Sequence, residues 1–517
     1  MTSQATSGSV ERELKLKLLP RDLGRVEAAL VPLARRASPW RRVRTAYFDS
    51  EDLRLHAAGI ALRLRHDGLA RLLSVKADRV EHGGVQAARE CEIACRARLP
   101  AVARIPDAAL RARIDSALAG VALLRLHETD VRRRTFLVEA RGAVVEVALD
   151  RGRIRAGDAA EPVCEVELEL LAGDASALFD LAETLLGGLP AAPGQPSKAE
   201  RGLALWARAT GAMLPPAEPP PPATAADAAG RWMAACARAI GAHLFATLTD
   251  DAPEGPHQLR VWLRRLRACL WLFRPLIRPR VARDLAAMAR DMARAAGAWR
   301  DADVLVGGVL LPAAREADPA LAEALAAWHR RTRREARAML VAHGATRELL
   351  ELCRIVALDR WPSGGRGAPL RPPEAVAVPR LARLWERIRS EGERLASLSP
   401  EDRHALRKRI KKLRYAYEKL YGAGRDRAFG SALKRVQDSL GALNDLAVLG
   451  TFRPMLADKE MQMRLDRLLA DLPGAGRHRG DLAMGRACRH WRALSALTPP
   501  WEAALPAPLP RPAARSR

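Results

Sequence analysis

A proline-rich segment divides this chain into two parts with different hydrophobic patterns. Residues 213–226, MLPPAEPPPPATAA, form a stiff and extended spacer rather than a packed element. Before the spacer, short runs alternate apolar and charged residues, which is typical of strands. After it, long Ala/Leu/Arg segments with few β-branched residues repeat their apolar positions with a helical period.

A second break at residues 361–375, WPSGGRGAPLRPPEA, divides the helical part into two halves. We therefore expect an α+β multidomain protein. Its predicted parts are a β-rich module over 1–209, a linker over 210–226, a helical module over 227–497 with halves at about 227–360 and 376–497, and a disordered tail over 498–517.

The rest of the composition excludes several classes of protein. A hydrophobic content of 49% is that of a folded protein and argues against wholesale disorder. We find no apolar run of about 18 residues that could span a membrane, and no apolar signal core near the N-terminus, so we expect a cytoplasmic protein. The seven cysteines form no CxxC pair, so neither a disulfide framework nor a zinc cage is expected.

Positive charge is concentrated in the helical part. The chain carries a net charge of +26, and the residues after 210 contribute 53 basic and 32 acidic side chains to it. Such an excess indicates a polyanionic partner, such as nucleic acid or polyphosphate.

In the N-terminal module, charge is sorted by strand. Side chains alternate between the two faces of a strand, so residues two apart share a face. One face of successive runs gathers Glu11, Glu13, Lys15 and Lys17; Arg63 and Arg65; Glu90 and Glu92; Arg132 and Arg134; Glu146 and Asp150; and Glu165, Glu167 and Glu169. The ordinary interpretation is an antiparallel sheet with one solvated face.

Sorting of this kind also fits a sheet closed into a barrel with its charged face inward. Carboxylates inside such a barrel could hold a hard divalent cation, because Mg²⁺ and Mn²⁺ prefer oxygen ligands. Arg and Lys side chains could bind phosphate oxygens, and Arg can do so through two hydrogen bonds. A metal-bound chain of phosphates would suit this interior.

These runs resemble the CYTH, or triphosphate tunnel metalloenzyme, superfamily. Glu11-x-Glu13-x-Lys15 is similar to its E-x-E-x-K signature, and the order of the later charged residues agrees through Ser197-Lys198. The resemblance implies an eight-stranded antiparallel tunnel that binds triphosphate with Mg²⁺ or Mn²⁺. Known members hydrolyse inorganic triphosphate, thiamine triphosphate or RNA 5′-triphosphates, or cyclise ATP.

Roles within the expected tunnel follow from side-chain chemistry together with this resemblance. We expect catalytic roles for Glu11, Glu13 and Lys15, of which Lys15 is a phosphate ligand rather than a base because its carboxylate neighbours favour its protonated form. The expected metal ligands are Glu11, Glu13, Asp150, Glu165, Glu167 and Glu169. The expected phosphate ligands are Lys17, Arg63, Arg65, Lys76, Arg132, Arg134 and Lys198.

The helical part carries one constellation twice. His257, Arg260, Arg264 and Arg267 have the same spacing as His404, Arg407, Lys411 and Arg414. Each set lies on one side of a helix, and no acidic residue interrupts 255–283 or 403–417. A solvated helix face normally mixes charge signs, so an anion-binding surface is favoured. An echo follows each copy, GAWRDADVL at 297–305 and GALNDLAVL at 441–449, which indicates a duplicated helical unit.

This part resembles the CHAD domain, an all-helical repeat named for conserved histidines. The resemblance implies two helical bundles with a basic groove for inorganic polyphosphate. The residues that carry it are His257, Arg260, Arg264, Arg265, Arg267, His404, Arg407, Lys411, Lys412 and Arg414. A DNA-reading motif is not recognisable in these helices, so nucleic acid is not a favoured partner.

The leading hypothesis is a metal-dependent inorganic triphosphatase tunnel joined to a polyphosphate-binding helical domain. One alternative is a catalytically weak protein that binds polyphosphate or targets polyphosphate granules. Another is adenylyl cyclase or thiamine triphosphatase activity in the same tunnel, because the tunnel charges address the phosphates and not the group attached to them.

Overall fold

The computed structural model describes most of the chain. The described residues are 7–68, 70–214, 221–364, 370–422, 427–451, 456, 458–471 and 477–502. Parts of the predicted linker, of the break at 361–375 and of the predicted tail lie outside them. The chain forms two compact units, one of Met1–Pro221, Ala237–Asp250 and Gly344–Arg360, the other of Pro222–Cys236, Asp251–His343 and Trp361–Arg517.

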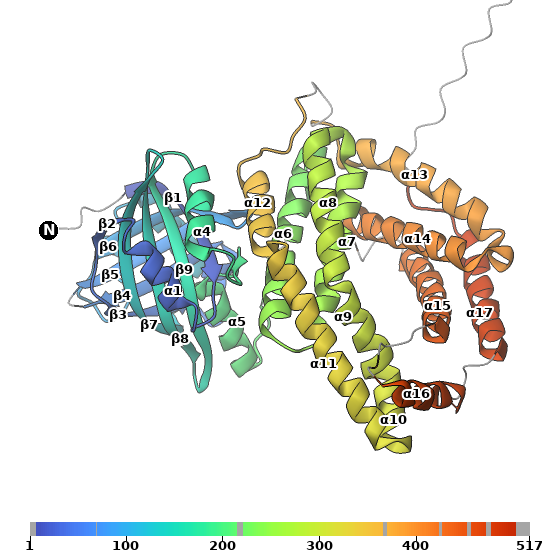
Figure 1. The fold of residues 1–517 in the computed structure, drawn as a ribbon. Coiled ribbons are helices and arrows are strands. Elements are labelled where there is room, and N and C mark those ends of the chain that lie inside the picture. Colours follow the sequence, from blue (N-terminus) through green and yellow to red (C-terminus); the bar gives the residue numbers. More distant parts are fainter. Residues whose placement is uncertain are drawn as a thin grey trace, which may run out of the picture. The chain divides into compact units, whose positions relative to one another are not determined.

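The first unit is built around a closed antiparallel barrel (Figure 1). Eight strands follow one another around it in the order β1-β6-β5-β4-β3-β7-β8-β9, and β9 pairs with β1 to close the ring. The strands are β1 (Ser7–Lys17), β3 (Arg41–Asp49), β4 (Ile60–Asp67), β5 (Ala70–His82), β6 (Val85–Ala94), β7 (Leu124–Ala140), β8 (Ala143–Ala156) and β9 (Ala159–Ala172). Short strands β2 (Ala34–Ala37) and β10 (Ala192–Pro193) pair with β7 and β1. This confirms the predicted eight-stranded tunnel.

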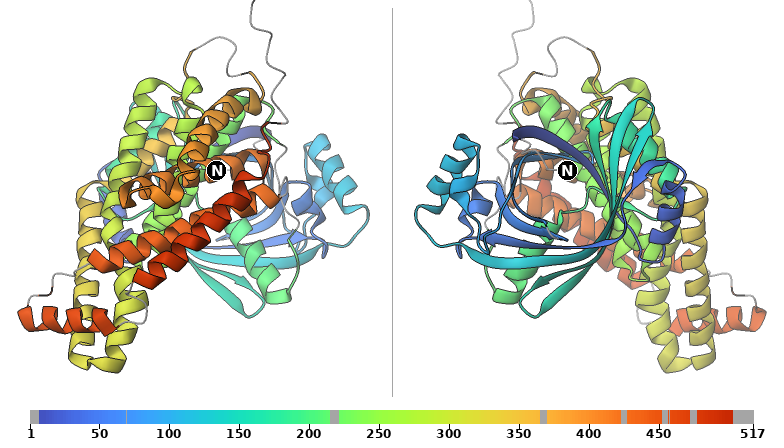
Figure 2. Two further views of the ribbon diagram at one scale, coloured as in Figure 1. Left: turned by 90° about the vertical axis from the view of Figure 1, so that its right-hand side faces the viewer. Right: turned by 90° about the vertical axis from the view of Figure 1, so that its left-hand side faces the viewer.

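Apolar side chains on the outer face of the barrel pack against helices. Leu62 and Val75 of β4 and β5 belong to a buried cluster with Ile114 of helix α3 (Ala108–Leu118). Helix α4 (Ser176–Leu186) packs on β1, β8 and β9, and α1 (Leu23–Leu30) contacts α4. Because strand side chains alternate, covering the apolar face from outside leaves the charged face to line the interior. The strands can be followed around this interior in Figure 2.

Helix α5 (Lys198–Thr210) brings further polar groups to the barrel. It begins with a capping box, in which the Ser197 hydroxyl accepts from the backbone N–H of Glu200 and the Glu200 carboxylate accepts from the backbone N–H of Ser197. Its apolar face packs on β7 and β8, with Leu203 buried beside Leu126. Lys198, the first residue of the helix, is thereby fixed at the barrel interior.

The remaining helices of the first unit lie outside the barrel wall. Besides α2 (Arg54–Ala57), they include α12 (Ala345–Ala357) and the later part of α6 (Ala225–Thr249), which sequence analysis assigned to the helical module. Close packing explains their place in this unit. A Cβ added at Gly83 would lie 2.5 Å from the backbone nitrogen of Ala357, and Arg354 lies 2.9 Å from Asp180.

The second unit is helical (Figure 1). Its helices are α7 (Glu254–Leu272), α8 (Pro279–Ala295), α9 (Gly297–Ala302), α10 (Leu311–Ala317), α11 (Pro319–Ala342), α13 (Pro373–Gly392), α14 (Pro400–Tyr421), α15 (Arg427–Thr451), α16 (Lys459–Asp471) and α17 (Arg477–Ser495), together with the first part of α6. Amphipathic helices with buried Leu and Ala positions confirm the predicted all-α class. None of the described helices is long and apolar enough to cross a membrane.

The predicted boundary of the C-terminal tail needs a correction. Trp501 is completely buried, and its ring packs edge-on against Phe429 and Trp385. A large aromatic side chain held in this way is part of the core. Ordered structure therefore continues beyond residue 498, and the rest of the predicted tail lies outside the described residues.

Candidate functional site

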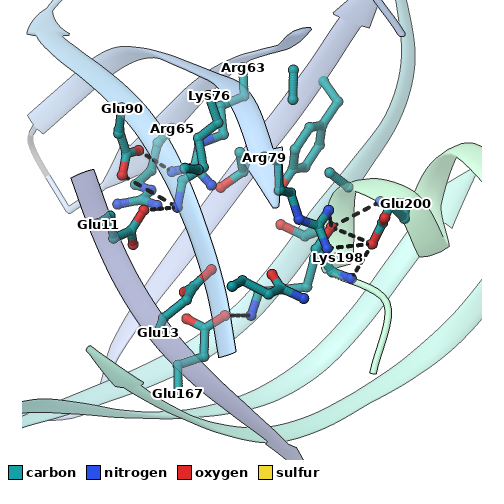
Figure 3. A pocket seen from close by; sticks show the side chains of 18 of the residues that line it. Glu11, Glu13, Arg63, Arg65, Lys76, Arg79, Glu90, Glu167, Lys198 and Glu200 are labelled. Atoms are coloured by element: carbon teal, nitrogen blue, oxygen red, sulfur yellow. Dashed lines mark hydrogen bonds and ion pairs between the residues drawn. The ribbon is translucent and has the colours of Figure 1, made fainter. Parts of the chain in front are cut away.

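Charged side chains from most of the barrel strands converge on one cavity of about 720 Å³ (Figure 3). Carboxylates line it from β1, β6, β8 and β9, while cations enter from β1, β4, β5, β7 and α5. The charged lining residues include Glu11, Glu13, Lys15, Arg63, Arg65, Lys76, Arg79, Glu90, Glu92, Arg133, Glu146, Glu167, Glu169 and Lys198. Sequence analysis expected this convergence, and it occurs inside an enclosed barrel.

One side of the cavity pairs its carboxylates with cations. Lys76 forms ion pairs with Glu11 and, at 3.3 Å, with Glu90. Arg63 donates to Glu90 at 2.7 Å and to the Ser74 hydroxyl at 2.9 Å. Burial raises the pKa of Glu11 to about 8 despite Lys76, and the neighbouring carboxylates Glu13 and Glu90 add to the rise. Arg63 and Lys76 lower the pKa of Glu90, so Glu11 is the carboxyl of this pair whose charged form is less favoured.

A row of three carboxylates crosses strands β1, β9 and β8. Glu169 is the direct strand partner of Glu13 on one side and of Glu146 on the other. Directly opposed like charges destabilise a sheet unless a cation intervenes. Burial, followed by repulsion from Glu146, raises the pKa of Glu169 to about 7. At Glu13, Lys15 and Lys76 outweigh burial and lower the pKa, so Glu169 is the carboxyl of the row whose charged form is least favoured.

A second acidic group lies at the floor of the cavity and is neutralised from within. Asp150, Glu165 and Glu167 place carboxylate oxygens within 4.8 Å of one another. Lys198 donates to Asp150 at 2.7 Å, to Glu167 at 3.0 Å and to Glu165. Burial alone would raise the pKa of Asp150, but Arg133 and Lys198 outweigh it and lower that pKa. We call Asp150, Glu165, Glu167 and Lys198 the floor cluster.

Lys15 joins this floor to the carboxylate row. Its ammonium lies 2.9 Å from Glu13 and 3.2 Å from Glu167. Burial would lower the pKa of Lys15, but the carboxylates of Glu13 and Glu167 outweigh it and raise the pKa. The surroundings of Lys15 therefore favour its charged form.

The structure corrects the predicted arginines of β7. Arg132 is exposed, and Arg134 lies outside the cavity, where it donates to the Ser38 carbonyl at 3.0 Å and stacks over Phe136. Arg133 points inward instead and holds Asp150 through two hydrogen bonds of 2.7 and 2.6 Å. With three arginines in a row, the sequence does not show which of them face the interior of the barrel. The register of β7 and β8 shows it, because Arg133 is the cross-strand partner of Asp150.

Three other predicted residues also lie apart from the cavity lining. Lys17 is exposed at the end of β1, with its ammonium 5.4 Å from the centre of the Phe245 ring. Asp150 and Glu165 face the interior but are buried beneath the lining, where they contact Lys198.

Sequence reasoning missed several lining residues. Alternation placed Glu146 on one strand face with Asp150, but no role was assigned to it. Arg79 follows an irregularity in β5 after residue 77, which breaks the alternation, and it donates to Ser197 and Glu200 at 2.8 Å. His127, which no motif marks, is 5% exposed and stacks on Tyr47 with ring centres 4.4 Å apart.

The two acidic groups differ in how well they fit a divalent metal. Glu13, Glu146 and Glu169 offer hard oxygen ligands from three neighbouring strands, and of these Glu13 is already ion-paired with Lys15. The floor cluster has the closer carboxylates, but an ammonium lies among them.

In the second unit, the two predicted basic sets face each other. Helices α7 and α14 pack together, and the electrostatic neighbours of Lys411 are Arg407, Arg264, Arg260 and Arg414. Burial and then these arginines lower the pKa of Lys411 to about 7. Such crowding of like charges stores repulsion that a bound anion would relieve. We call these five residues the basic cluster.

Local geometry supports the duplication. Arg260 donates to the Gly297 carbonyl at 3.0 Å, and a Cβ added at Gly297 would lie 3.6 Å from its guanidinium. In the other copy, a Cβ added at Gly441 would lie 3.4 Å from the guanidinium of Arg407. The two glycines begin the two echo segments, so equivalent arginines pack on equivalent positions. His404 makes a 2.6 Å contact with Asn444.

Other predicted polyphosphate ligands are placed differently. Arg265 stacks over Trp262 and Tyr415 and lies 3.6 Å from Glu418, so it is engaged within the fold. Lys412 lies over the ring of Trp271 and near Arg267, apart from the five residues of the basic cluster. His257 has Arg300, Arg264 and Arg260 among its neighbours.

Comparisons with known proteins agree with this architecture. The CYTH domain model matches residues 9–202, and the CHAD domain model matches residues 231–454. An inorganic triphosphatase of Haemophilus influenzae is 39% identical over 83 residues, which are 16% of this chain. The match spans 24% of the length of that relative.

Solved structures with similar parts include a putative adenylyl cyclase from Hippeastrum, HpAC1, described as having a dominant triphosphatase activity. It is 20% identical, covers 40% of this chain and 98% of its own, and has a TM-score of 0.27. The CHAD domain from the plant Ricinus communis is 24% identical, covers 51% of this chain and 92% of its own, and has a TM-score of 0.39.

A closed barrel with inward-facing carboxylates and cations, followed by basic helices, defines a two-domain protein of the tunnel class. The chain contains a CYTH domain followed by a CHAD domain. CYTH domains are metalloenzymes, and the acidic groups of this barrel offer carboxylates that could hold a metal.

Proposed function

We propose that the barrel hydrolyses inorganic triphosphate with the help of a divalent cation, and that the helical domain binds polyphosphate. The observation that carries the proposal is the convergence of carboxylates and cations from separate strands on one cavity. A chain of phosphates needs both kinds of group, because its oxygens bind cations directly and bind to carboxylates only through a metal.

In this proposal, Arg63, Arg65 and Lys76 bind the phosphate oxygens. All three line the cavity, and each is already paired with a carboxylate that keeps it oriented. Positive charge held in place before the reaction stabilises charge on the leaving phosphate without reorganisation. Lys15 supplies a further fixed cation beside Glu13.

Glu13, Glu146 and Glu169 would hold the divalent cation, with Glu11 beside them. When bound, such a cation neutralises phosphate charge and polarises the bond that breaks. These carboxylates come from β1, β8 and β9, and each is the cross-strand partner of another carboxylate of the row. They would therefore hold the cation on this side of the cavity.

The test is phosphate release from tripolyphosphate in the presence of Mg²⁺ or Mn²⁺. We expect Glu13→Gln and Arg63→Gln each to lower kcat by about 10²–10³-fold, the usual cost of removing one group that stabilises the transition state. Arg132→Ala is the matched control, because Arg132 is exposed outside the barrel. A wild-type protein that releases no phosphate would refute the proposal.

The basic cluster supports the polyphosphate part of the proposal. Its cations come from α7 and α14 and lie near one another, and Lys411 is destabilised in its charged form. An anion with many closely spaced charges would satisfy several of these groups at once. Binding of long-chain polyphosphate should weaken at least about tenfold in Arg264→Ala/Arg407→Ala. Lys434→Ala, which removes an exposed cation of α15, should not change it.

A second candidate substrate is an organic triphosphate. Between β3 and β7, the cavity lining includes the uncharged side chains Thr45, Tyr47, His127 and Thr129. Burial lowers the pKa of His127 to about 4, so its ring is neutral near pH 7. Parallel assays with ATP and thiamine triphosphate, including detection of cyclic AMP, decide between the two candidates.

A further inference from the structure

The wall formed by β3, β7 and β8 is covered from inside the barrel over part of its length. Val43 and Val131 line the cavity, and with Ile154 they belong to a buried apolar cluster that also contains Leu205 of α5. Because strand side chains alternate, the residues beside these three strand positions face outward. The outer face of this wall therefore carries exposed charged residues instead of an apolar layer.

Three arginines of β8 lie on this outer face. Arg151, Arg153 and Arg155 occupy alternate positions of the strand, and all three are exposed. A strand rises about 3.4 Å per residue, so neighbouring members are about 7 Å apart and the three span about 14 Å. We call them the β8 arginines. They form a row of cations along one strand.

The strand partners of the first two β8 arginines do not neutralise them. Arg153 is opposite Asp130, but both carboxylate oxygens of Asp130 accept hydrogen bonds from Arg42. Arg151 is opposite Arg132, which has the same charge. Directly opposed like charges destabilise a sheet unless a counter-charge lies between them. An anion on this face would supply that counter-charge.

The third β8 arginine is opposite a carboxylate that lies close to another arginine. Arg155 is the strand partner of Glu128, and Glu128 lies 3.4 Å from Arg125 of its own strand. Within the described residues, the side chains of the β8 arginines form no ion pair and donate no hydrogen bond. Their guanidinium groups therefore keep their full donor capacity for a ligand.

A linear chain of phosphates has the chemistry that this row would bind. Guanidinium groups bind phosphate oxygens through charge-assisted hydrogen bonds. Because the row is spread along a strand, a long chain can contact all three groups at once, whereas a single phosphate contacts only part of the row. Aromatic side chains, on which the bases of single-stranded nucleic acid would stack, are absent from positions 128, 130, 132, 151, 153 and 155 of this face. The face therefore favours phosphates without bases.

We propose that the outer face of β8 is a second binding site for linear inorganic polyphosphate, which lies along the strand across the β8 arginines. The site is separate from the cavity, because none of the three arginines belongs to the cavity lining. The inference goes beyond the proposed function, which places the reaction inside the barrel and polyphosphate on the helical domain.

Modification of the full chain by phenylglyoxal, followed residue by residue with mass spectrometry, tests this site. The reagent attacks accessible guanidinium groups. Long-chain polyphosphate should lower modification of the β8 arginines at least about threefold, and tripolyphosphate at the same phosphate concentration should lower it by less than about twofold. Arg98 and Arg104, exposed arginines of the same unit, should keep their reactivity throughout.

A variant series measures the contribution of the row to affinity. The starting chain carries the two alanine substitutions of the basic cluster described above, which weaken binding to the helical domain. In that chain, Arg151→Gln/Arg153→Gln should weaken binding of long-chain polyphosphate at least about tenfold, because two charge-assisted hydrogen bonds are lost. Arg98→Gln/Arg104→Gln removes the same charge from another exposed segment and should leave the affinity unchanged. Circular dichroism establishes that the variants fold, and the modification experiment needs no variant.

Unchanged reactivity of the β8 arginines in the presence of long-chain polyphosphate would overturn the inference. Equal protection by tripolyphosphate would also overturn it, and so would equal protection by single-stranded DNA at the same phosphate concentration. Protection of the β8 arginines in a chain that releases no phosphate and whose basic cluster stays reactive would refute the proposed function and leave this site standing.

Discussion

Arg133 and Arg132 provide a direct test of which face of β7 looks into the barrel. Arg133→Ala removes three hydrogen bonds, two to the fully buried Asp150 and one to Glu167. Removing one partner of a buried ion pair costs about 3–5 kcal/mol, because the other charge stays buried. Each kcal/mol lowers Tm by about 2–4 °C in a unit of this size, so the barrel should unfold about 6–20 °C lower.

Arg132→Ala removes the same side chain one position earlier, where it is exposed. A surface substitution of this kind changes stability by about 0.5 kcal/mol or less, which is a shift of about 2 °C at most. Thermal unfolding followed by circular dichroism at pH 7 compares the two variants. Adding Asp150→Asn to Arg133→Ala should recover part of the loss, because it removes the stranded charge. Equal losses in the two single variants would refute the assigned strand parity.

Three further predictions concern pH and packing. The pKa of Glu169 lies near 7 in the fold, above its usual value of 4.5, so its contribution to stability is present below about pH 4.5 and is lost as pH rises through 7. In thermal scans, the Tm of the metal-free protein should therefore fall over this range, and Glu169→Gln should make Tm depend less on pH. Lys411, with a pKa near 7, should bind polyphosphate more tightly below pH 7 than above it, and Lys411→Arg should remove this step from titrations between pH 6 and 8.5. Gly202→Ala should destabilise the first unit by about 1–3 kcal/mol in denaturant unfolding, because the new Cβ would lie 1.9 Å from the His127 ring. His127→Ala in the same chain should restore part of this stability, and no recovery in the double variant would contradict the packing.

Strand alternation was enough to predict the interior wherever charged residues alternate with apolar ones. In β1, Lys15 stands between buried Leu14 and Leu16, and charged residues of β9 also alternate with buried apolar ones, so the pattern has only one interpretation. In β7, Arg132, Arg133 and Arg134 are consecutive, and only the pairing with Asp150 of β8 distinguishes them. Cross-strand register depends on the whole barrel, which local pattern does not contain.

The floor cluster shows a second limit of the sequence. The Glu165-x-Glu167-x-Glu169 triplet predicts three equivalent carboxylates on one strand face. In the structure, Lys198 arrives from a helix that begins more than thirty residues after Glu165 and neutralises two of the three. The duplicated basic motif was easier to interpret, because both copies carry their own evidence, although its aromatic neighbours Trp262 and Trp271 were overlooked.

The placement of apolar packing outside the barrel separates stability from chemistry. Leu73, Val75 and Ile114 belong to the buried apolar cluster of the wall, whereas charged lining residues such as Arg63 and Glu90 do not. An interior residue such as Thr45 or Thr129 can therefore be exchanged while the supporting layer stays intact. This division would let descendants of one barrel adopt different phosphorylated substrates by small steps, each of which preserves a folded protein.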